Sequence, residues 1–379
     1  MENSKSLIFW FDQPPKVGKG CFNYMTKAWK GKVIYAYLHD FNEIRKSVKW
    51  DDGDYGDAVM VDLSKNTEEK IKNIFQSEID AIHIVAGFKS SVIKYLDDYI
   101  FSNKYQFICF SERPGVYGKW WQRIIKRAYV PISEMLIAKK YQRYVKAYLP
   151  LGIQGVNENK HYGWKNEKLY PFMYDPVDCV TDKNVYPVNS PMRFLYVGRF
   201  SRYTKGTDIL LKALNEVKAD KSLYTIDFVG GYGDMKDEVI SWAENTENAS
   251  FLGSWNSLDV GNNMKKYDVC IVPSKFDGWN LLVNEATRAH IGVIASDEAV
   301  SHEVVAHSGA GIVVKACRPK EMAKAIEYAV NSPEIVAGWK EKSKAYSPKI
   351  SSESVGDYVI DIINYECLHI GASRPVCPW

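Results

Sequence analysis

The sequence predicts an α/β fold built from two doubly wound parallel sheets, each covered by helices. Apolar strand-like runs alternate with amphipathic helix-like runs along most of the chain, which is the pattern of successive βαβ units. A polar stretch with two prolines, from Thr181 to Pro191, divides this alternation and is typical of an interdomain linker. We therefore expect one domain over residues 1–185 and a second over residues 186–347.

The predicted elements follow one another with short connections. In the first half the predicted strands are Leu7–Phe11, Val33–Leu38, Ala81–Ala86 and Tyr105–Phe110, and the predicted helices are Cys21–Lys30, Glu68–Ser77 and Ser90–Phe101. In the second half the predicted strands are Phe194–Val197, Thr225–Val229, Ser250–Leu252, Val269–Val272, Val293–Ala295 and Gly311–Val314. Helices are predicted near Lys320–Asn331 and Glu334–Tyr346, with a last apolar helix over Ser352–Leu368.

The composition is that of a globular protein large enough for two hydrophobic cores. The chain has 379 residues, 46% of them hydrophobic, and its 49 basic and 46 acidic residues give a formal charge of +3. That balance neither favours nor excludes a polyanionic partner. No apolar run approaches the ~20 residues that cross a bilayer, and Leu7–Phe11 is too short for a signal peptide. Seven cysteines without a Cys-x-x-Cys pair predict a reduced, cytoplasmic protein with no metal knuckle or disulfide framework.

Two acids surround the start of a helix in the second half. The buried strand that ends at Val272 leads into Pro273, a glycine loop and a helix, with Asp277 in the loop and Glu285 eight positions later inside the helix. Both acids can face the crevice beyond the strand's carboxyl end, where open α/β sheets bind ligands. The N–H groups at the helix start point the same way and favour an anion such as phosphate. These groups together predict a nucleotide-sugar site, whereas the plain alternative is a strand–turn–helix connection with surface acids.

Two cations occupy an equivalent place after an earlier strand. The run Phe194-Leu195-Tyr196-Val197 ends in Gly198 and Arg199, and Lys205 and Gly206 precede an amphipathic helix. Arg199 has a planar fork that suits phosphate oxygens, and Lys205 is a mobile point charge. Two cations in a solvated loop are unremarkable alone, but their order and spacing relative to Asp277 and Glu285 favour a binding role.

These two segments resemble the family-4 glycosyltransferases, which have the GT-B fold of two Rossmann-like domains facing each other across a cleft. The family motif Pro-Ser-x-x-Glu-Gly-Phe-Gly-Leu-x-x-x-Glu-Ala matches Pro273 to Ala286 in order and spacing. Asp277 replaces the first Glu, Trp279 replaces Phe and Asn280 replaces the second Gly. The resemblance covers Pro191 to Asn331 well and Lys5 to Pro150 only by pattern. Downstream, His290 and Gly292 replace the usual Gly and Pro of a strand-leading turn.

The resemblance implies a role for each matching residue. Arg199 and Lys205 would stabilise the departing nucleoside diphosphate, Glu285 would bind the ribose, and Asp277 would hold the donor sugar. Backbone groups of the donor-binding turns would approach the nucleotide sugar; these residues are Gly198, Gly230, Gly231, Gly278, Trp279, Asn280, Leu281 and Leu282. In this family the last helices cross back to complete the first domain, which Ser352–Leu368 can do, although it can also be an ordinary terminal docking helix.

The activity that the resemblance implies is transfer of a sugar from a nucleotide diphosphate to a hydroxyl with retention at the anomeric carbon. The expected co-substrate is a UDP- or GDP-sugar, with no cofactor and no metal, and the expected acceptor is a glycan or lipid-linked sugar in polysaccharide or glycoconjugate synthesis. Two alternatives stay open because Asp277 is one methylene shorter than Glu and a family His is missing. One is an inactive homologue that binds a sugar or a partner, and the other is a nucleotide-sugar epimerase of the same fold.

The acceptor side is less sharply marked. Family resemblance suggests that the loop with Gly18 and Gly20 covers the donor phosphates and acceptor, although a plain surface turn fits as well. Where family members place a His after the fourth strand, this chain has Ser111 and Glu112. Glu112 can act on an acceptor hydroxyl or pair with Arg113. His83, in a strand-like run, favours a packed core residue.

An acidic segment resembles a metal motif of a different glycosyltransferase class. Asp52-Gly53-Asp54 is similar to the Asp-x-Asp with which GT-A enzymes hold manganese and diphosphate, and its oxygens suit Mg²⁺ or Mn²⁺. Its surroundings favour a solvated acidic loop instead, and Arg199 and Lys205 already supply positive charge.

Residues 119–146 form a basic amphipathic segment. It carries eight lysines and arginines against the single acid Glu134, with tryptophans, isoleucines and a tyrosine interleaved. Such a segment can lie in a membrane interface and meet anionic lipid, which would place the protein at the inner face of the membrane. Alternatively, the helix packs its tryptophans into the first core. Nucleic-acid binding fits the composition, but no recognised module supports it.

Overall fold

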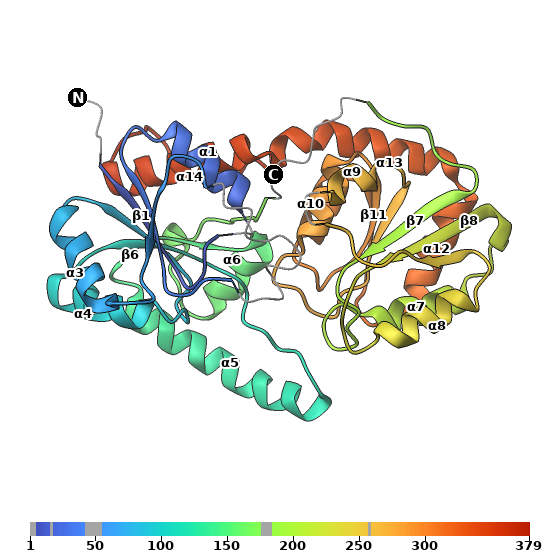
Figure 1. Ribbon diagram of the computed structural model, residues 1–379, viewed down its shortest axis with the longest axis horizontal. Coiled ribbons are helices and arrows are strands. Elements are labelled where there is room, and N and C mark those ends of the chain that lie inside the picture. Colours follow the sequence, from blue (N-terminus) through green and yellow to red (C-terminus); the bar gives the residue numbers. More distant parts are fainter. Residues whose placement is uncertain (1–4, 16–17, 42–54, 176–183, 257–258) are drawn as a thin grey trace. The chain divides into compact units, whose positions relative to one another are not determined.

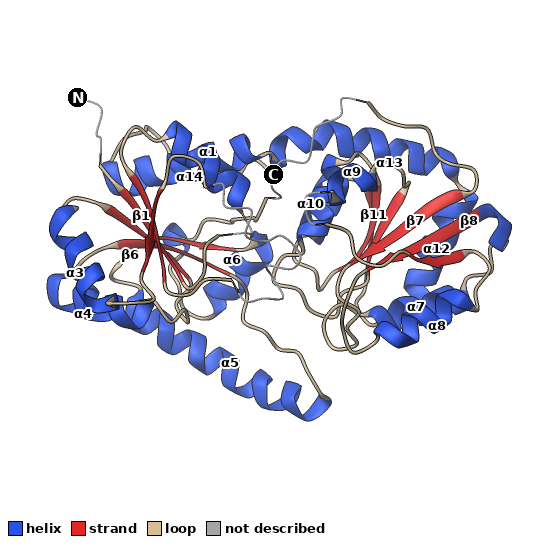
Figure 2. Cartoon of the chain, in the orientation of Figure 1, coloured by secondary structure: helices blue, strands red, loops and turns tan. Residues whose placement is uncertain are grey.

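The computed structural model describes residues 5–15, 18–41, 55–175, 184–256 and 259–379, and the chain forms two compact units. Unit 1 comprises Met1–Arg113, Ala128–Val177 and Ser351–Pro378, and unit 2 comprises Pro114–Arg127, Asp178–Ile350 and Trp379. Each unit contains a six-stranded sheet with helices packed on both faces (Figure 1, Figure 2). Every pair of neighbouring strands is parallel. The predicted α/β class of two parallel sheets is therefore confirmed.

Unit 1 has the strand order β3-β2-β1-β4-β5-β6. Its strands are β1 (Leu7–Phe11), β2 (Val33–Tyr37), β3 (Val59–Asp62), β4 (Ile82–Ala86), β5 (Phe107–Ser111) and β6 (Val145–Pro150). Its helices and short turns are α1 (Lys19–Ala28), α3 (Thr67–Ser77), α4 (Ile93–Asn103), α6 (Gly152–His161), η1 (Asn166–Lys168), α14 (Ser352–Ile363) and η4 (Asn364–Leu368). Helix α5 (Trp120–Tyr141) starts in residues grouped with unit 2 and continues in unit 1.

The central strands of unit 1 are buried on both faces, as a parallel sheet between two helical layers requires. Alternate residues of β1 point to opposite sides. Ile8 and Trp10 belong to the core that α3, α4 and α5 cover, whereas Phe9 and Phe11 stack edge-on against Phe22 of α1. Figure 1 shows these two helical layers, with α1 and α14 on one face of the sheet and α3 and α4 on the other.

Unit 2 has the strand order β12-β11-β10-β7-β8-β9. Its strands are β7 (Met192–Val197), β8 (Tyr224–Val229), β9 (Ala249–Phe251), β10 (Val269–Val272), β11 (Gly292–Ser296) and β12 (Gly311–Val314). Its helices and turns are α7 (Thr207–Glu216), η2 (Lys221–Leu223), α8 (Lys236–Glu244), α9 (Val260–Met264), α10 (Leu281–Arg288), α11 (His302–Ser308), α12 (Pro319–Asn331), α13 (Pro333–Tyr346) and η3 (Ser347–Ile350).

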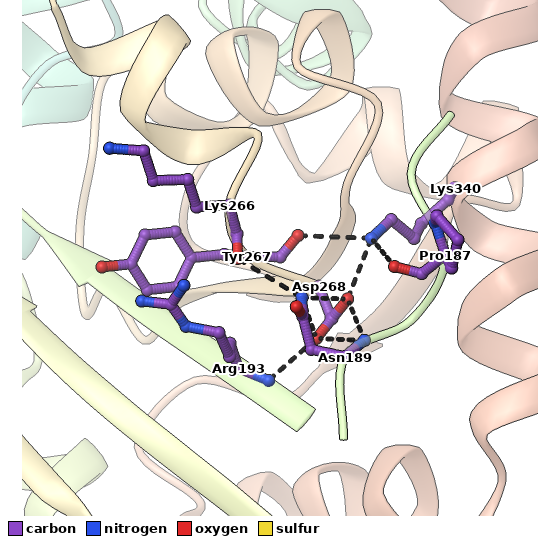
Figure 3. A network of polar contacts seen from close by, with 7 residues as sticks. All are labelled: Pro187, Asn189, Arg193, Lys266, Tyr267, Asp268 and Lys340. Carbon is purple, nitrogen blue, oxygen red and sulfur yellow. Dashed lines mark hydrogen bonds and ion pairs between the residues drawn. The ribbon is translucent and has the colours of Figure 1, made fainter. Parts of the chain in front are cut away.

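A buried ion pair fixes the start of the two central strands of unit 2 (Figure 3). The Lys340 ammonium on α13 lies 2.9 Å from Asp268 Oδ1, and both side chains are almost completely buried. Asp268 also accepts hydrogen bonds from the backbone N–H groups of Asn189 and of Arg193, the second residue of β7. Because buried charge is tolerated only when it is fully paired, this network ties the segment after the linker, β7, β10 and α13 to one point.

The sequence prediction missed β3 and β6, which are the two edge strands of the first sheet. An edge strand contacts one neighbour, so its residues need not all be buried, and a short or interrupted apolar run there is hard to recognise. In β3 none of the four residues is fully buried, and β6 carries a lysine and ends in a proline. The central strands were predicted to within one or two residues.

The C-terminal helix α14 packs against α1 of unit 1, and one buried carboxylate joins the starts of both helices. Asp175 Oδ1 accepts the backbone N–H of Cys21 in the first turn of α1, at 3.0 Å. Its Oδ2 accepts the hydroxyl of Ser352, the first residue of α14, at 2.5 Å. The carboxylate thus satisfies an amide in the first turn of α1 that would otherwise lack a partner, and it ties the first residue of α14 to the same point through a hydroxyl.

The core position predicted for His83 is confirmed. His83 lies on β4, is buried, and stacks with Trp10 and Phe75. Its Nδ1 accepts the indole N–H of Trp10 at 3.1 Å, so protonation of Nδ1 would remove that acceptor. Burial lowers the pKa of His83 from 6.5 to about 4, because the charged imidazolium is disfavoured away from water.

This burial predicts a pH-dependent contribution to stability. The unfolded chain binds a proton at His83 below pH about 6.5 and the folded chain only near pH 4, so stability present above pH 6.5 is lost as the pH falls. Between pH 7 and pH 5 the loss amounts to about 2 kcal/mol. The variant His83→Gln keeps an acceptor for Trp10 but cannot titrate. Urea unfolding at pH 7 and pH 5 measures the free energy of unfolding of wild type and His83→Gln. The free energy of wild type relative to the variant should be lower at pH 5 than at pH 7 by that amount. An identical difference at both values would contradict it.

Candidate functional site

The order of strands in unit 2 places two loops side by side. The chain runs outward from β7 through β8 to β9, returns to β10 on the other side of β7, and continues outward through β11 to β12. The carboxyl ends of β7 and β10 therefore form the switch point of the sheet, where open α/β sheets bind ligands. The loop after β7 carries Arg199 and Lys205, and the loop after β10 carries Asp277. Sheet topology thus brings together the cationic and acidic motifs of the sequence.

A chain of hydroxyl contacts fixes the loop after β7. The backbone N–H of Ser201 donates to Thr207 Oγ1 at 3.0 Å, and this hydroxyl lies 3.0 Å from the hydroxyl of Tyr196. Tyr196 in turn donates to the carbonyl of Arg199 at 3.0 Å. Burial, followed by the charge of Asp277, raises the pKa of Tyr196, so it stays a neutral donor. The buried Tyr196 of β7 therefore fixes the backbone that carries Arg199.

The two loops are in direct backbone contact. Gly206 has φ +67°, and a Cβ added to it would lie only 1.9 Å from the Pro273 carbonyl oxygen, so a side chain there is excluded. The carbonyl of Thr204 accepts the N–H groups of Lys275 at 2.7 Å and Phe276 at 3.2 Å. This contact gives the two motifs one fixed register.

Two ion pairs cross between the same segments. Lys205 of the first loop pairs with Asp277 of the second, and Lys275 of the second pairs at 2.8 Å with Asp208 at the start of α7. All four side chains are less than a third exposed, so their attraction is stronger than that of ordinary surface pairs. The guanidinium of Arg199 donates to the Thr204 hydroxyl at 3.1 Å in this loop.

Helix α10 leaves one narrow strip open. Six of its eight residues are buried, and the two that remain partly exposed are Leu281 and Glu285, which are four positions apart and share one face. Glu285 therefore lies on the accessible side of an otherwise buried helix. Its charge acts on the thiol of Cys270 in β10, whose pKa is raised first by burial and then by Glu285.

The start of α10 shows which groups of the predicted donor-binding turn have partners within the protein. The side chain of Asn280 accepts the N–H of Leu282 at 3.2 Å, so this N–H is already engaged, and the Leu282 side chain is buried. The Trp279 side chain is also buried and donates to Asn284 at 2.9 Å, which makes it a core residue. The predicted donor contacts through the backbone of residues 278–281 stay a prediction; Gly278 and Trp279 are buried in this turn, whereas Asn280 and Leu281 are partly exposed.

The predicted glycine turns lie where backbones come close. A Cβ on Gly230 would lie 2.2 Å from the Gly198 carbonyl oxygen, so the turns after β8 and β7 approach each other. A Cβ on Gly231 would lie 2.2 Å from the Ser254 hydroxyl. Around Gly198 itself, no atom lies within 4 Å of the added Cβ, which leaves space beside Arg199 in the described part of the chain.

In unit 1 the structure modifies the predicted glycine loop. Gly18, at φ +77°, caps α1, but Gly20 lies inside the first turn of that helix and is buried. The prediction that Gly20 belongs to a flexible loop is therefore wrong, because Asp175 binds the N–H of Cys21 and starts the helix earlier than Cys21. The neighbouring residues 16–17 lie outside the described part.

The other predicted acceptor residues have protein partners. The hydroxyls of Ser111 and Tyr148 lie 2.7 Å apart. Burial raises the pKa of Tyr174, and a hydrogen bond to Glu112 raises it further. The guanidinium of Arg113 pairs with Glu158 at 2.8 Å. Asp12, in the loop after β1 at the switch point of this sheet, was not predicted; its carboxylate accepts the N–H groups of Ser91 and Val92, just before α4.

The predicted metal alternative concerns residues that the structure does not describe. Asp52-Gly53-Asp54 lies within residues 42–54. Elsewhere, among the described residues, no group of three or more His, Cys, Asp or Glu side chains is arranged to hold a metal ion.

Helix α5 exposes its tryptophans, which overturns the alternative that they pack into the core. Its second half buries Val130, Glu134 and Ala138, and Glu134 pairs with Lys89 at 2.6 Å. Eight large apolar residues are 46% to 75% exposed; they are Trp120, Trp121, Ile124, Ile125, Tyr129, Ile132, Met135 and Leu136. At about 3.6 residues per turn they fall on one half of the helix circumference. Among the described helices, none is long and apolar enough to span a bilayer.

Residues 182–346 match the family model of Glycosyl transferases group 1. This range contains Arg199, Lys205, Asp277 and Glu285. A Klebsiella pneumoniae protein, described as an uncharacterized 41.2 kDa protein in the cps region, is 25% identical over 285 residues, or 73% of this chain and 75% of its own. The uncharacterized glycosyltransferase MJ1607 of Methanocaldococcus jannaschii is 27% identical over 180 residues, or 44% of each chain.

Solved structures share the fold at low sequence identity. Anabaena Alr3699/HepE in complex with UDP superposes with a TM-score of 0.72 at 12% identity, covering 95% of this chain and 100% of that one. HepE has also been solved with UDP and glucose and with UDP-glucose. A mutant of S. aureus TarM, in complex with fondaparinux, alpha-GlcNAc-glycerol and UDP, gives a TM-score of 0.64 at 11% identity over 94% and 99% of the two chains. The predicted GT-B fold is thereby confirmed.

Two departures from the family motif occupy positive-φ positions. Asn280 has φ +79° and His290 has φ +59°, and both stand where the family pattern has glycine. Asparagine tolerates this region better than most residues, and its side chain caps α10. Gly292, in place of the usual proline, packs under Trp339, whose ring would lie 2.8 Å from an added Cβ.

Replacing Asn280 separates its two roles. Asn280→Ala removes the cap and leaves a β-carbon at positive φ, which should destabilise the protein by about 1–2 kcal/mol. Asn280→Gly loses the same cap but relieves the backbone, so its effect should be only a few tenths of a kcal/mol. Urea unfolding of both variants measures the difference. Equal destabilisation by Ala and Gly would show that positive φ carries no penalty at this position.

Proposed function

We propose that this protein is a retaining glycosyltransferase that moves a sugar from a nucleotide diphosphate to a hydroxyl acceptor. The observation that supports it most strongly is the junction of the two loops at the β7/β10 switch point. There Arg199, Lys205 and Asp277 share one fixed site on the accessible side of unit 2. The match to Glycosyl transferases group 1 over the same residues supports the reaction class.

Each charged group has a role that follows from its chemistry. The Arg199 fork and the Lys205 ammonium suit the oxygens of a diphosphate, whose negative charge grows as the sugar departs. Asp277 is an acceptor for hydroxyl groups of the donor sugar. Glu285, on the open strip of α10, is an acceptor for the ribose hydroxyls. Because these groups position and stabilise rather than react covalently, most of the acceleration is electrostatic.

The Lys205–Asp277 pair couples the two halves of the donor. An ammonium has three N–H donors, and a diphosphate brings more negative charge than one carboxylate. Binding of the diphosphate therefore draws Lys205 toward phosphate and leaves Asp277 oxygens available for sugar hydroxyls. Loop contacts through Thr204 and Gly206 keep both groups in place during this exchange.

The comparisons guide the choice of substrates. HepE binds UDP and UDP-glucose, and the TarM mutant was solved with UDP and saccharide ligands, so we propose a UDP-sugar donor and a glycan or lipid-linked acceptor. The location of the Klebsiella relative in the cps region agrees with a role in polysaccharide synthesis. Retention rests on the resemblance of Pro273–Ala286 to the family-4 motif. Proton NMR of the product, with the same anomeric configuration as the donor, tests it.

Variants of the two cations test the diphosphate site. Arg199→Ala and Lys205→Ala should each weaken UDP binding by roughly 10- to 100-fold, the value of a charge-assisted hydrogen bond. Neither should change the binding of uridine, which lacks the diphosphate. Glu285→Gln should weaken both ligands, because it acts on the ribose. Isothermal titration with UDP and uridine measures these constants, and turnover of UDP-sugars should fall about 10²- to 10³-fold in the cation variants.

Arg202→Ala is the matched control for these variants. Arg202 lies in the same loop, is exposed, and pairs at 2.7 Å with Glu238, so its removal should leave UDP affinity unchanged. Equal UDP affinity in wild type, Arg199→Ala and Lys205→Ala would refute the proposed site. Normal UDP binding without any transfer to a panel of acceptors would instead favour a sugar-binding homologue.

We further propose that the exposed half of α5 lies in a membrane interface at the cytoplasmic face. The eight exposed apolar residues form one continuous face, and lysines and arginines occur along the same helix. An apolar face flanked by cations matches the two layers of an anionic membrane surface, acyl chains below and charged headgroups above. Tryptophan and tyrosine prefer this boundary because one end of each ring system is polar.

Charge placed on this face should prevent membrane binding. The double variant Ile124→Glu with Ile125→Glu changes two exposed residues, so folding should be preserved while partition to phospholipid vesicles falls at least about tenfold. Flotation with vesicles of phosphatidylcholine and phosphatidylglycerol measures this partition. Leu223→Glu, an exposed leucine outside α5, is the control and should float like wild type. Unchanged flotation of the double variant would exclude α5 as the contact.

A further inference from the structure

A basic cavity lies in unit 1 at the C-terminal end of α5. Its volume is about 720 Å³, and it opens where the end of α4, the turn before β6 and the η1 segment meet. The lining residues are Phe101, Leu136, Lys139, Lys140, Gln142, Arg143, Lys165 and Lys168. Five of these eight side chains are cationic, and none is acidic. Such a concentration of one charge in a concave surface focuses its field on an anion.

The floor of this cavity is held by hydrogen bonds. The Lys168 ammonium donates to the carbonyls of Gln142 at 2.7 Å and Val145 at 2.5 Å. The Gln142 side chain accepts the backbone N–H of Lys165 at 2.7 Å. These contacts join the turn before β6 to the η1 segment. They fix Lys168 and the backbone of the two segments, so part of the cluster is ordered before a ligand binds.

The cluster has more positive than negative charge. Lys140 pairs with Asp97 at 2.6 Å, and Lys165 lies 3.9 Å from the exposed Glu167. Five cations against these two acids leave an excess of three positive charges. Burial, and next the charge of Lys165, lowers the pKa of Lys168, and the opposing charges of Glu366 and Glu167 do not reverse this shift.

Leu136 connects this cavity to the apolar face of α5. It lines the cavity and is also 62% exposed on the same half of the helix as Ile132 and Met135. A molecule in the cavity therefore touches the surface that we assign to the membrane. Phosphate is the anionic group that such a surface meets, because it lies at the level where acyl chains end.

We propose that this cavity binds the phosphate headgroup of an anionic phospholipid. The inference rests on the membrane contact proposed for α5 and adds the lipid class that the protein selects. Arg143 offers a planar fork for two phosphate oxygens, and its guanidinium is steadied over the ring of Tyr144 at 4.7 Å. Lys139 and Lys165 add point charges, and Leu136 contacts the adjoining acyl chain.

The test compares vesicles that differ only in headgroup charge. Wild type should bind vesicles of phosphatidylcholine with 30% phosphatidylglycerol at least tenfold more tightly than pure phosphatidylcholine, since each cation near anionic lipid contributes roughly fivefold. The double variant Lys139→Gln with Arg143→Gln should lose most of this preference but still bind phosphatidylcholine through α5. The control, Lys324→Gln with Lys344→Gln, removes two exposed cations of unit 2 and should keep the preference.

The outcomes separate this site from the functions proposed above. Equal preference in wild type and the Lys139/Arg143 variant overturns the headgroup site alone. Binding of wild type to neither kind of vesicle overturns the membrane contact as well. Millimolar glycerol 3-phosphate or inorganic phosphate that abolishes the preference would assign the cavity to a soluble phosphate and overturn the lipid. UDP affinity, measured on the same variants, should be unchanged and reports on the donor site independently.

Discussion

The contact between the loops after β7 and β10 is the constraint on which the rest of the donor site depends. Sheet order makes these loops neighbours, but their register comes from Gly206, which lets the first backbone touch the carbonyl of Pro273. Crossed pairing of Lys205 with Asp277 and of Lys275 with Asp208 then fixes the loops from both sides. A cation and an acid of opposite motifs therefore have defined positions before any ligand arrives, which lowers the ordering that binding requires.

The fold was predictable where a segment is buried on both faces. Strands β1, β2 and β10 are continuous apolar runs whose residues are almost all buried, and such runs were recognised in the sequence. Strand β3 was missed because its four residues are partly or fully exposed. Strand β6 was missed although five of its six residues are buried, because a lysine and a terminal proline interrupt its apolar pattern. Burial alone does not decide whether a strand is recognised, since β12 was predicted from its apolar run although only one of its four residues is buried.

The site was predictable in its residue types but not in its pairing. Spacing along the chain placed Arg199 and Lys205 after one strand and Asp277 after another, and the topology made these strands adjacent. Nothing local indicated that Lys205 would pair with Asp277, because such a pair depends on the register of two distant loops. The positive φ of Asn280 and His290 was implicit, since each replaces a family glycine. The burial of Trp279 and the hydrogen bond on the Leu282 N–H could not be predicted, because a sequence motif does not separate a side chain that packs from one that binds a ligand.

The sequence of helix α5 likewise did not determine which of its faces is buried. Its sequence indicates an amphipathic basic helix, but the pattern alone allows the tryptophans either to enter the core or to face outward. Packing decides this, because Ala138 and Tyr141 belong to the first hydrophobic core and Val130 is also buried. Pro131 has no backbone N–H, so one carbonyl of the preceding turn lacks its helical donor. Once that face is occupied, the opposite apolar half has no partner within the described unit.

The two clusters of cations differ in how their positive charge is compensated. Lys205 and Lys275 of the donor loops are balanced by carboxylates placed opposite them, whereas the cluster that lines the cavity keeps an excess of positive charge. A balanced site can exchange its own acid for a substrate, and an unbalanced one holds an anion supplied from outside, so the two clusters are suited to turnover and to anchoring respectively.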